Sequence, residues 1–342
     1  MIVTADPLVA DIADDAAWDR LTWSADRHLG AVRIGFASGP IAPADRGEIG
    51  ERCDVVYAVP EDEAADRAVV GADDPEMAAR DLAEHVARNP QAATTLAAVL
   101  RTGTQVSVRQ ALDVESWAYS TLLGGDEFAT WLASRGPRPL PPNPQVSPVI
   151  VERDGGRLTV TLNRPERRNA FGAALRDALV ESLDVAVLDE AVTEIHLRGA
   201  GPVFCAGGDL DEFGTTPNPV LAHFIRTAGG AGVRLAQIAD RTTAFLHGAC
   251  VGAGIELPGL VGRVVVDPDV AIRLPEVSMG LIPGAGGTVG IPRRIGRWRT
   301  FHLAVTGDAI GAQTALRWGL ADEVADVTRV DLSARETGLR TI

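Results

Sequence analysis

The first third of the chain changes from strand-like to helix-like patterns of hydrophobic positions. Residues 31–36 (AVRIGF) and 54–59 (DVVYAV) are short apolar runs, and they predict two strands. From residue 74 onward the spacing of apolar residues becomes helical, and Pro75 and Pro90 mark helix starts. We expect helices over residues 74–88, 89–100, 108–123 and 127–134.

The last two of these predicted helices carry a set of large apolar side chains. They are spaced as on one buried helical face, which is typical of core or of a docking surface rather than of a ligand site. The set is Leu112, Trp117, Tyr119, Leu122, Leu123, Phe128 and Trp131. We find no catalytic motif in this region and expect it to supply structure or an interface.

A proline-rich stretch divides the chain. Residues 136–148 contain six prolines, which disfavour helix and favour an extended connector. We therefore expect an accessory α/β, mostly helical domain over residues 1–135, a linker over 136–148 and a second domain over 149–342. The total of 342 residues fits two domains of about 100–200 residues each.

Strands and helices alternate after the linker. Residues 149–153 and 157–162 predict a hairpin, because Asp154-Gly155-Gly156 between them has turn chemistry. A helix is predicted over residues 172–184. Further strands are predicted at residues 194–199, 241–248, 263–266 and 271–274, with helical patterns between several of them. Such alternation indicates an α/β fold.

Composition narrows the class of protein. The chain has 46% hydrophobic and 23% charged residues, as ordinary globular proteins have. No run approaches the roughly 18 apolar residues of a membrane helix, and the N-terminus lacks a secretory signal pattern. Three cysteines are too few for a disulfide framework, so we expect a cytoplasmic protein with no membrane partner. The net charge of −14 argues against nucleic acid as a partner.

Three segments of the second half suggest chemistry. They are FCAGGDL at 204–210, GACVGAGIEL at 248–257, and LPE at 274–276, which runs into GLIPGAGGT at 280–288. The first two are small-residue turns, at which backbone N–H groups can approach a ligand closely. Glu256 and Glu276 add carboxylates beside such turns. Bare amides together with two carboxylates can stabilise an oxyanion while protons move beside it.

These segments, together with LNRPERRNAF at 162–171, closely resemble the crotonase superfamily, whose best-known members are enoyl-CoA hydratases. The resemblance covers roughly residues 147–328 and includes the order and spacing of the motifs. It implies a core of repeated ββα units arranged as a spiral. It also implies an acyl-CoA substrate, no further cofactor and a homo-oligomer, either a trimer or a hexamer.

The resemblance assigns roles to single residues. It makes the backbone N–H groups of Ala206 and Ala253 the oxyanion donors, and Glu256 and Glu276 the catalytic carboxylates. It places Arg168 and Ala170 near coenzyme A. The complete set expected to bind coenzyme A is Arg168, Ala170, Ala206, Gly207, Gly208 and Asp209, and no metal ligand is expected.

Other residues near these motifs have simpler readings. Asp209 is expected to cap the segment that follows it. Cys205 is expected to be a small buried hydrophobic residue, and His247 is expected to have a structural role. The chain contains no Lys, so phosphate contacts would need arginine, backbone amides or a helix N-terminus. The arginine clusters are Arg164, Arg167 and Arg168, and Arg293, Arg294, Arg297 and Arg299. Each cluster fits either a phosphate site or a solvated patch.

Hydration of a 2-enoyl-CoA is the expected reaction, because members of the superfamily with other activities often lack one or both glutamates. Isomerisation of the double bond or hydrolysis of the thioester on the same scaffold is an alternative, and so is a non-catalytic binding protein. Relatives usually continue beyond the segment at 319–324 with helices that cover the acyl pocket. Residues 329–339 have modest helical character. We therefore hypothesise that the N-terminal helices provide the cover.

Overall fold

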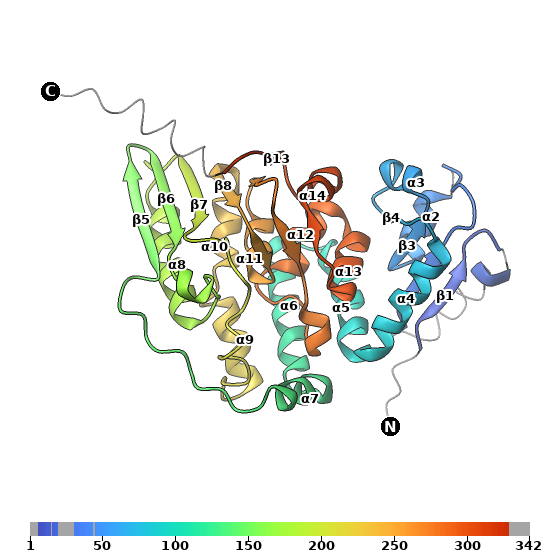
Figure 1. Cartoon of the computed structure of the whole chain (residues 1–342), viewed down its shortest axis with the longest axis horizontal. Helices are drawn as coiled ribbons and strands as arrows, with labels where there is room; N and C mark the ends of the chain where they lie inside the picture. The colour runs from blue at the N-terminus through green and yellow to red at the C-terminus, as the bar shows by residue number, and fades with distance from the viewer. Residues whose placement is uncertain (1–5, 15, 20–30, 44, 328–342) are drawn as a thin grey trace.

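The computed structural model describes residues 6–14, 16–19, 31–43 and 45–327. Figure 1 shows a small sheet from the start of the chain at one end of the molecule and the hairpin that follows the linker at the other. The helices between the small sheet and the linker lie in the middle, against elements from the last third of the chain (Figure 1).

The N-terminal sheet has four parallel strands in the order β1-β2-β3-β4. Its elements are β1 (Leu8–Asp11), β2 (Arg33–Phe36), α2 (Arg46–Arg52), β3 (Val55–Ala58), α3 (Pro60–Ala65) and β4 (Val69–Gly71). The sequence pattern predicted β2 and β3, and both are confirmed. It missed β1 and β4, which contain no aromatic residue, whereas β2 and β3 contain Phe36 and Tyr57, which are typical of strands.

Four helices follow, as the spacing predicted, with ends that differ by a few residues at most. They are α4 (Pro75–Arg88), α5 (Pro90–Gly103), α6 (Val108–Leu122) and α7 (Asp126–Arg135). The carboxylate of Asp74 accepts a hydrogen bond from the Met77 N–H and caps α4. Ser107 and Gln110 form a capping box at the start of α6.

The main sheet lies after the linker and has six strands in the order β13-β10-β8-β7-β6-β5. The predicted hairpin is confirmed, since β5 and β6 pair antiparallel, and the other neighbours are parallel. The strands are β5 (Val149–Asp154), β6 (Arg157–Leu162), β7 (Glu194–Gly199), β8 (Thr242–Leu246), β10 (Arg263–Val266) and β13 (Glu323–Val324).

A second sheet has three short strands in the order β12-β11-β9. Its strand β9 lies within the glycine-rich segment at residues 248–257. Its strands are β9 (Ala249–Val251), β11 (Ala271–Arg273) and β12 (Ile310–Gly311). The helices of this half are α8 (Ala173–Leu188), α9 (Pro219–Thr227), α10 (Gly232–Gln237), α11 (Ala253–Glu256), α12 (Gly287–Ile295), α13 (Arg297–Thr306) and α14 (Ala312–Trp318). The α/β fold expected from the sequence is confirmed. The helical character noted at residues 329–339 lies outside the described residues.

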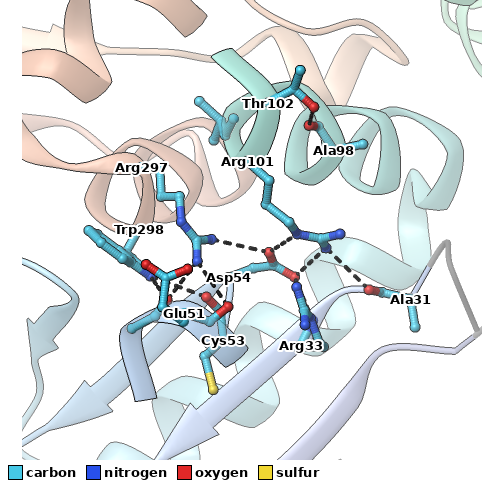
Figure 2. A network of polar contacts seen from close by, with 12 residues as sticks. Ala31, Arg33, Glu51, Cys53, Asp54, Ala98, Arg101, Thr102, Arg297 and Trp298 are labelled. Carbon is cyan, nitrogen blue, oxygen red and sulfur yellow. Dashed lines mark hydrogen bonds and ion pairs between the residues drawn. The ribbon is translucent and has the colours of Figure 1, made fainter. Parts of the chain in front are cut away.

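Asp54 joins the N-terminal sheet to the helices packed against it (Figure 2). Its carboxylate is 2% exposed and receives the Arg101 side chain of α5 at 2.7 Å and 2.8 Å. The backbone N–H of Arg33 donates to it at 2.9 Å, and Arg297 of α13 lies 3.6 Å away. One buried carboxylate therefore connects a strand, an N-terminal helix and a helix of the second half.

The arginine cluster at residues 293–299 lies at the interface between the N-terminal region and the second half of the chain. Arg297 donates to the Gly50 carbonyl, Arg299 to the carbonyls of Glu63 and Val69, and Arg293 to that of Gly103. Arg294 instead pairs with Asp322 within the second half. The cluster is thus neither a phosphate site nor a solvated patch. It satisfies backbone carbonyls of the N-terminal region, which would otherwise be buried without partners.

The two parts of the chain also share one hydrophobic core. Leu96 and Leu100 of α5 belong to the same buried cluster as Ile291 of α12 and Phe301 of α13. Residues 136–148 contain no helix or strand. The division into domains at this linker stays a prediction, and the two parts pack together as closely as elements within one domain.

Candidate active site

The first glycine turn follows β7 and contains the predicted donor Ala206. The N–H of Ala206 donates a 3.0 Å hydrogen bond to the carbonyl of Arg168. An N–H that is already bonded to the backbone cannot also be a free oxyanion donor. The assignment of that role to Ala206 is therefore wrong for this structure, and Ala206 does not line the cavity described below.

Gly208, two residues further, has the free amide. It forms an isolated parallel bridge with Phe171, in which the Phe171 N–H donates to Gly207 at 2.7 Å and the Asp209 N–H donates to Phe171 at 3.2 Å. In such a bridge the middle residue directs its own N–H away from the partner strand. Within the described part of the chain the Gly208 N–H has no partner, and Gly208 lines the cavity.

The second glycine turn places Ala253 at the first position of α11. Gly252 before it has a φ of +49°, so the strained backbone falls on glycine and Ala253 is free to be helical. Ala253 can therefore carry its Cβ at this position without backbone strain. The N–H of Ala253 has no partner among the described residues, as the first turn of a helix leaves it. Ala253 lines the same cavity as Gly208.

The carboxyl groups of Glu256 and Glu276 both lie close to Gly252. A Cβ at Gly252 would lie 2.4 Å from Glu276 Oε1 and 3.7 Å from Glu256 Oε1, so the two oxygens are no farther apart than these distances combined. Both side chains are buried, with exposures of 3% and 9%, and both line the cavity. The helix that carries Glu256 is a single turn followed by a 3₁₀ turn at Pro258–Leu260, which explains how Pro258 is tolerated.

The two carboxyl groups differ in their hydrogen bonds. Glu256 Oε2 accepts from the N–H groups of Ala285 at 2.7 Å and Gly287 at 3.1 Å. Glu276 Oε2 is buried without a hydrogen-bond partner. Bonds from backbone N–H groups stabilise an ionised carboxylate, whereas an unpartnered buried oxygen favours the protonated form.

Burial raises the pKa of both groups. The pKa of Glu276 rises to about 8 through burial and the nearby charge of Glu115. The pKa of Glu256 rises well above its ordinary value through burial and the charges of Glu276 and Glu115, against the two N–H bonds that lower it. Carboxyl groups so close together cannot all be ionised at neutral pH, which is the condition that an acid–base pair needs.

Glu115 on α6 is a third buried carboxylate that the sequence analysis did not identify. Its Oε1 accepts from the Gly286 N–H at 2.7 Å, and its Oε2 accepts from the Thr288 N–H at 2.9 Å and the Thr288 hydroxyl at 2.7 Å. Burial raises its pKa to about 7 despite these bonds. An acidic residue among the apolar positions of α6 was the available signal.

The cavity around these groups has a volume of about 200 Å³. Its apolar wall comes from both halves of the chain: Tyr119, Leu123, Phe128, Phe171, Phe213 and Ile225. Tyr119 lies on α6, four residues after Glu115, and Leu123 directly follows this helix. Phe128 lies on α7. The hypothesis that N-terminal helices cover the pocket therefore agrees with the structure, and they do so within one chain.

The residues expected at coenzyme A divide into two groups. Gly208 and Asp209 line the cavity, whereas Arg168, Ala170, Ala206 and Gly207 do not. The Asp209 carboxylate receives the Arg167 guanidinium at 2.7 Å and 3.0 Å, so Asp209 orders the first glycine turn through an ion pair. Arg168 has a left-handed backbone and an exposed side chain, and the prediction that it binds coenzyme A stays a prediction.

Cys205 and His247 have the structural roles expected of them. Cys205 is fully buried, and burial raises the pKa of its thiol to about 12, which makes it a poor nucleophile. The His247 ring lies 2.9 Å from the Gly201 carbonyl and does not line the cavity. Among the described residues, no group of three or more His, Cys, Asp and Glu side chains could hold a metal ion.

Comparison with known proteins decides the family. The model of the enoyl-CoA hydratase/isomerase family matches residues 152–340, which include every catalytic candidate of the second half. The chain belongs to the enoyl-CoA hydratase/isomerase family. Glu256 and Glu276 thus lie in a crotonase-type domain, as their spacing predicted.

Two relatives from Escherichia coli K12 carry different names on this scaffold. The chain is 34% identical over 179 residues to a 2,3-dehydroadipyl-CoA hydratase, covering 52% of this chain and 69% of the relative. It is 36% identical over 183 residues to a 1,2-epoxyphenylacetyl-CoA isomerase, covering 52% and 70%. Family membership alone therefore does not choose between hydration and isomerisation.

Solved structures confirm the fold of the second half. The enoyl-CoA hydratase of Thermoplasma volcanium matches with a TM-score of 0.51 and 30% identity, over 56% of this chain and 77% of that one. The enoyl-CoA hydratase of Bacillus anthracis matches with a TM-score of 0.50 and 30% identity, over 56% and 74%. Among the described residues, no helix is long and apolar enough to cross a membrane.

Proposed function

We propose that this protein adds water across the double bond of a 2-enoyl-CoA to give a 3-hydroxyacyl-CoA, and catalyses the reverse dehydration. The observation that carries the proposal is the pair Glu256 and Glu276 in one buried cavity, one bonded by backbone N–H groups and the other with an unpartnered oxygen. Hydration needs both a base for water and an acid for the substrate carbon, and this pair can supply both.

The thioester oxygen becomes negatively charged in such a reaction. The N–H groups of Gly208 and Ala253, which have no partner among the described residues, are the proposed donors to it. Removing one such donor typically raises the barrier by roughly 2.7–4 kcal/mol. Gly208 takes the role that the sequence analysis gave to Ala206, because the Ala206 N–H is already bonded.

The two glutamates divide the proton transfers. Glu256, whose carboxylate is stabilised by two N–H groups, orients and deprotonates the attacking water. Glu276, whose pKa rises to about 8 and whose Oε2 has no hydrogen-bond partner, holds the proton that the pair shares and delivers it to Cα. The charge of Glu276 is one of the causes that raise the pKa of Glu256, so protonation of Glu276 leaves Glu256 as the ionised partner. The reaction needs no cofactor beyond the coenzyme A thioester itself. A homotrimer or hexamer and a cytoplasmic location remain predictions that follow from the resemblance and the composition.

Isomerisation of the double bond is the second candidate, because one relative from Mycosarcoma maydis at 34% identity is named an enoyl-CoA isomerase/hydratase and the same carboxyl groups could move a proton between carbons. Thioester hydrolysis would use the same oxyanion donors. The three reactions give different products from one substrate: an added water, a shifted double bond or free coenzyme A.

The test is incubation of the purified protein with saturated, 2-enoyl, 3-enoyl and 3-hydroxyacyl-CoA thioesters, with products identified by chromatography and mass spectrometry. Glu256→Gln and Glu276→Gln are the test variants. Glu181→Gln, an exposed residue of α8, is the matched control. We expect the wild type and the control to add one water to 2-enoyl-CoA and both test variants to lose this activity. Turnover that survives in both would overturn the proposal.

A further inference from the structure

Arg226 of α9 borders the active-site cavity and has no acidic partner. It is half-buried, its guanidinium lies 4.3 Å from the centre of the Tyr119 ring, and it lines the cavity together with Glu256 and Glu276. Its Nη2 donates to the Ser120 hydroxyl and, at 3.4 Å, to the Ser116 carbonyl. Its Nε is buried without a hydrogen-bond partner.

Two other arginines near the site are each paired with a carboxylate. Arg176, in the same cavity wall, lies 2.7 Å from Asp177, and Arg234 of α10 lies 2.5 Å from Asp184. Among the described residues, no Asp or Glu oxygen comes within 4.0 Å of the Arg226 guanidinium. Burial lowers the pKa of Arg226, so desolvation of this cation is not fully offset.

Glu115 is the acidic residue that attracts Arg226 from within the protein. Its two oxygens, however, accept three hydrogen bonds from Gly286 and Thr288 and are directed at the start of α12. The charge of Glu115 therefore stabilises the Arg226 cation only at longer range. The guanidinium N–H groups have no ion pair with it. A partly desolvated guanidinium is the group that binds a carboxylate most effectively in such a setting.

The surroundings place this cation on the acyl side of the reacting centre. Arg226 lines the main cavity and also a smaller cavity of about 50 Å³ beyond it, whose wall includes Leu112, Gly232 and Leu257. Gly208 and Asp209, two of the residues expected at coenzyme A, line the main cavity, but none of the expected residues lines the smaller cavity. A cation in this position would meet the far end of an acyl chain rather than the phosphates of the carrier.

We propose that Arg226 binds a carboxylate at the far end of the acyl group, so that the substrate is the coenzyme A thioester of a short unsaturated dicarboxylic acid. This inference rests on the proposed function for its reaction but not for its binding site. The partly buried cation would reject uncharged acyl chains, because they leave it desolvated and unpaired. Arg226 would thus set the substrate class, while Glu256 and Glu276 perform the chemistry.

Binding of saturated thioesters tests the proposal without any chemistry. The probes are succinyl-, glutaryl- and adipyl-CoA. The affinity of each is compared by calorimetry with that of the uncharged acyl-CoA of the same number of acyl carbons. Free coenzyme A is measured as a further reference. We expect one dicarboxylic member to bind about 10- to 100-fold more tightly than its uncharged counterpart, as a charged hydrogen bond of about 1.5–3 kcal/mol allows. Arg226→Met should abolish this difference, and Arg226→Lys should retain part of it.

Two controls keep the result interpretable. Arg234→Met removes a neighbouring arginine that lines neither cavity and should leave the preference intact. Binding of free coenzyme A should be unchanged in Arg226→Met, which also shows that the variant is folded. The uncharged thioesters should bind at least as tightly as they bind to the wild type, because the unpaired cation is gone.

Two outcomes would overturn the inference. In the first, wild-type protein binds charged and uncharged acyl groups equally. In the second, Arg226→Met weakens free coenzyme A as much as the dicarboxylic thioester, which would make the carrier's phosphate the anion bound. A preference for the dicarboxylic thioester without any hydration would instead contradict the proposed reaction and leave the binding site standing.

Discussion

Glu115 and Thr288 join the two halves of the protein at the active site. The Glu115 carboxylate on α6 accepts hydrogen bonds from both the backbone N–H and the hydroxyl of Thr288, at 2.9 Å and 2.7 Å, at the start of α12. The glycine-rich turn before Thr288 supplies the N–H groups that hold Glu256. A helix that precedes the linker therefore helps to fix the position of Glu256, a proposed catalytic carboxylate that follows the linker.

The first prediction is the pH dependence of the wild type. Glu276 must be protonated to act as the acid in hydration, and its pKa is about 8. Its protonated fraction falls as the pH rises through that value, so kcat/KM for hydration should decline above about pH 8. Measurement of initial rates between pH 6 and 10 checks this. A profile that keeps rising through this range would contradict the role of Glu276 as acid.

Glu115→Gln should move that decline to lower pH. The charge of Glu115 raises the pKa of both Glu256 and Glu276, so its removal lowers both. The matched control is Glu127→Gln, since Glu127 also accepts two N–H groups at a helix start, those of Gln91 and Ala92. Both variants should lose some stability, but only Glu115→Gln should shift the pH profile. An equal shift in both would show a purely structural role.

Gly208→Pro should lower kcat by about 10²- to 10³-fold, the usual effect of losing one oxyanion donor, because proline has no backbone N–H. Gly208→Ala keeps this N–H, and its added Cβ would meet the tip of the Phe213 ring at 2.8 Å, so its effect should be smaller. Ala206→Gly is the control and should keep kcat near the wild-type value, because the Ala206 N–H is bonded to Arg168. If Ala206→Gly were the more damaging change, the corrected donor assignment would fail.

Asp54→Asn should destabilise the whole chain. The substitution replaces a buried carboxylate and leaves the cations of Arg101 and Arg297 without their ion pairs. Such a loss typically lowers the free energy of unfolding by about 3–5 kcal/mol. The exposed pair of Arg109 and Asp113 on α6, 3.9 Å apart, offers Asp113→Asn as control, with an expected cost of at most about 1 kcal/mol. Urea unfolding of both variants measures the difference. Equal midpoints would show that Asp54 does not hold the two halves together.

Much of this architecture could be predicted from the pattern of residues. The helices α4 to α7 have long apolar periods, and α4 and α6 also have capping side chains, so their limits were predicted within a few residues. The two glutamates proposed as catalytic belong to motifs whose spacing is specific. The strands β1 and β4 carry a weaker signal than β2 and β3, because they are as short or shorter and contain no aromatic residue.

The missed features depend on pairing between distant segments. Whether the N–H of Ala206 or of Gly208 is free depends on where the Arg168 carbonyl and Phe171 lie in space, and local sequence does not determine that. Glu115 becomes part of the site only because α6 packs against the start of α12, more than 170 positions later in the chain. The arginines of α12 and α13 likewise find their carbonyl partners only in the folded state.

The most direct test of the account is turnover of a 2-enoyl-CoA in water enriched in ¹⁸O, with the product followed by mass spectrometry. We expect a 3-hydroxyacyl-CoA that carries one ¹⁸O atom, formed at a rate that Glu276→Gln lowers by about 10²- to 10⁴-fold. A thioester with a shifted double bond and no ¹⁸O, or free coenzyme A with ¹⁸O in the released acid, would contradict it.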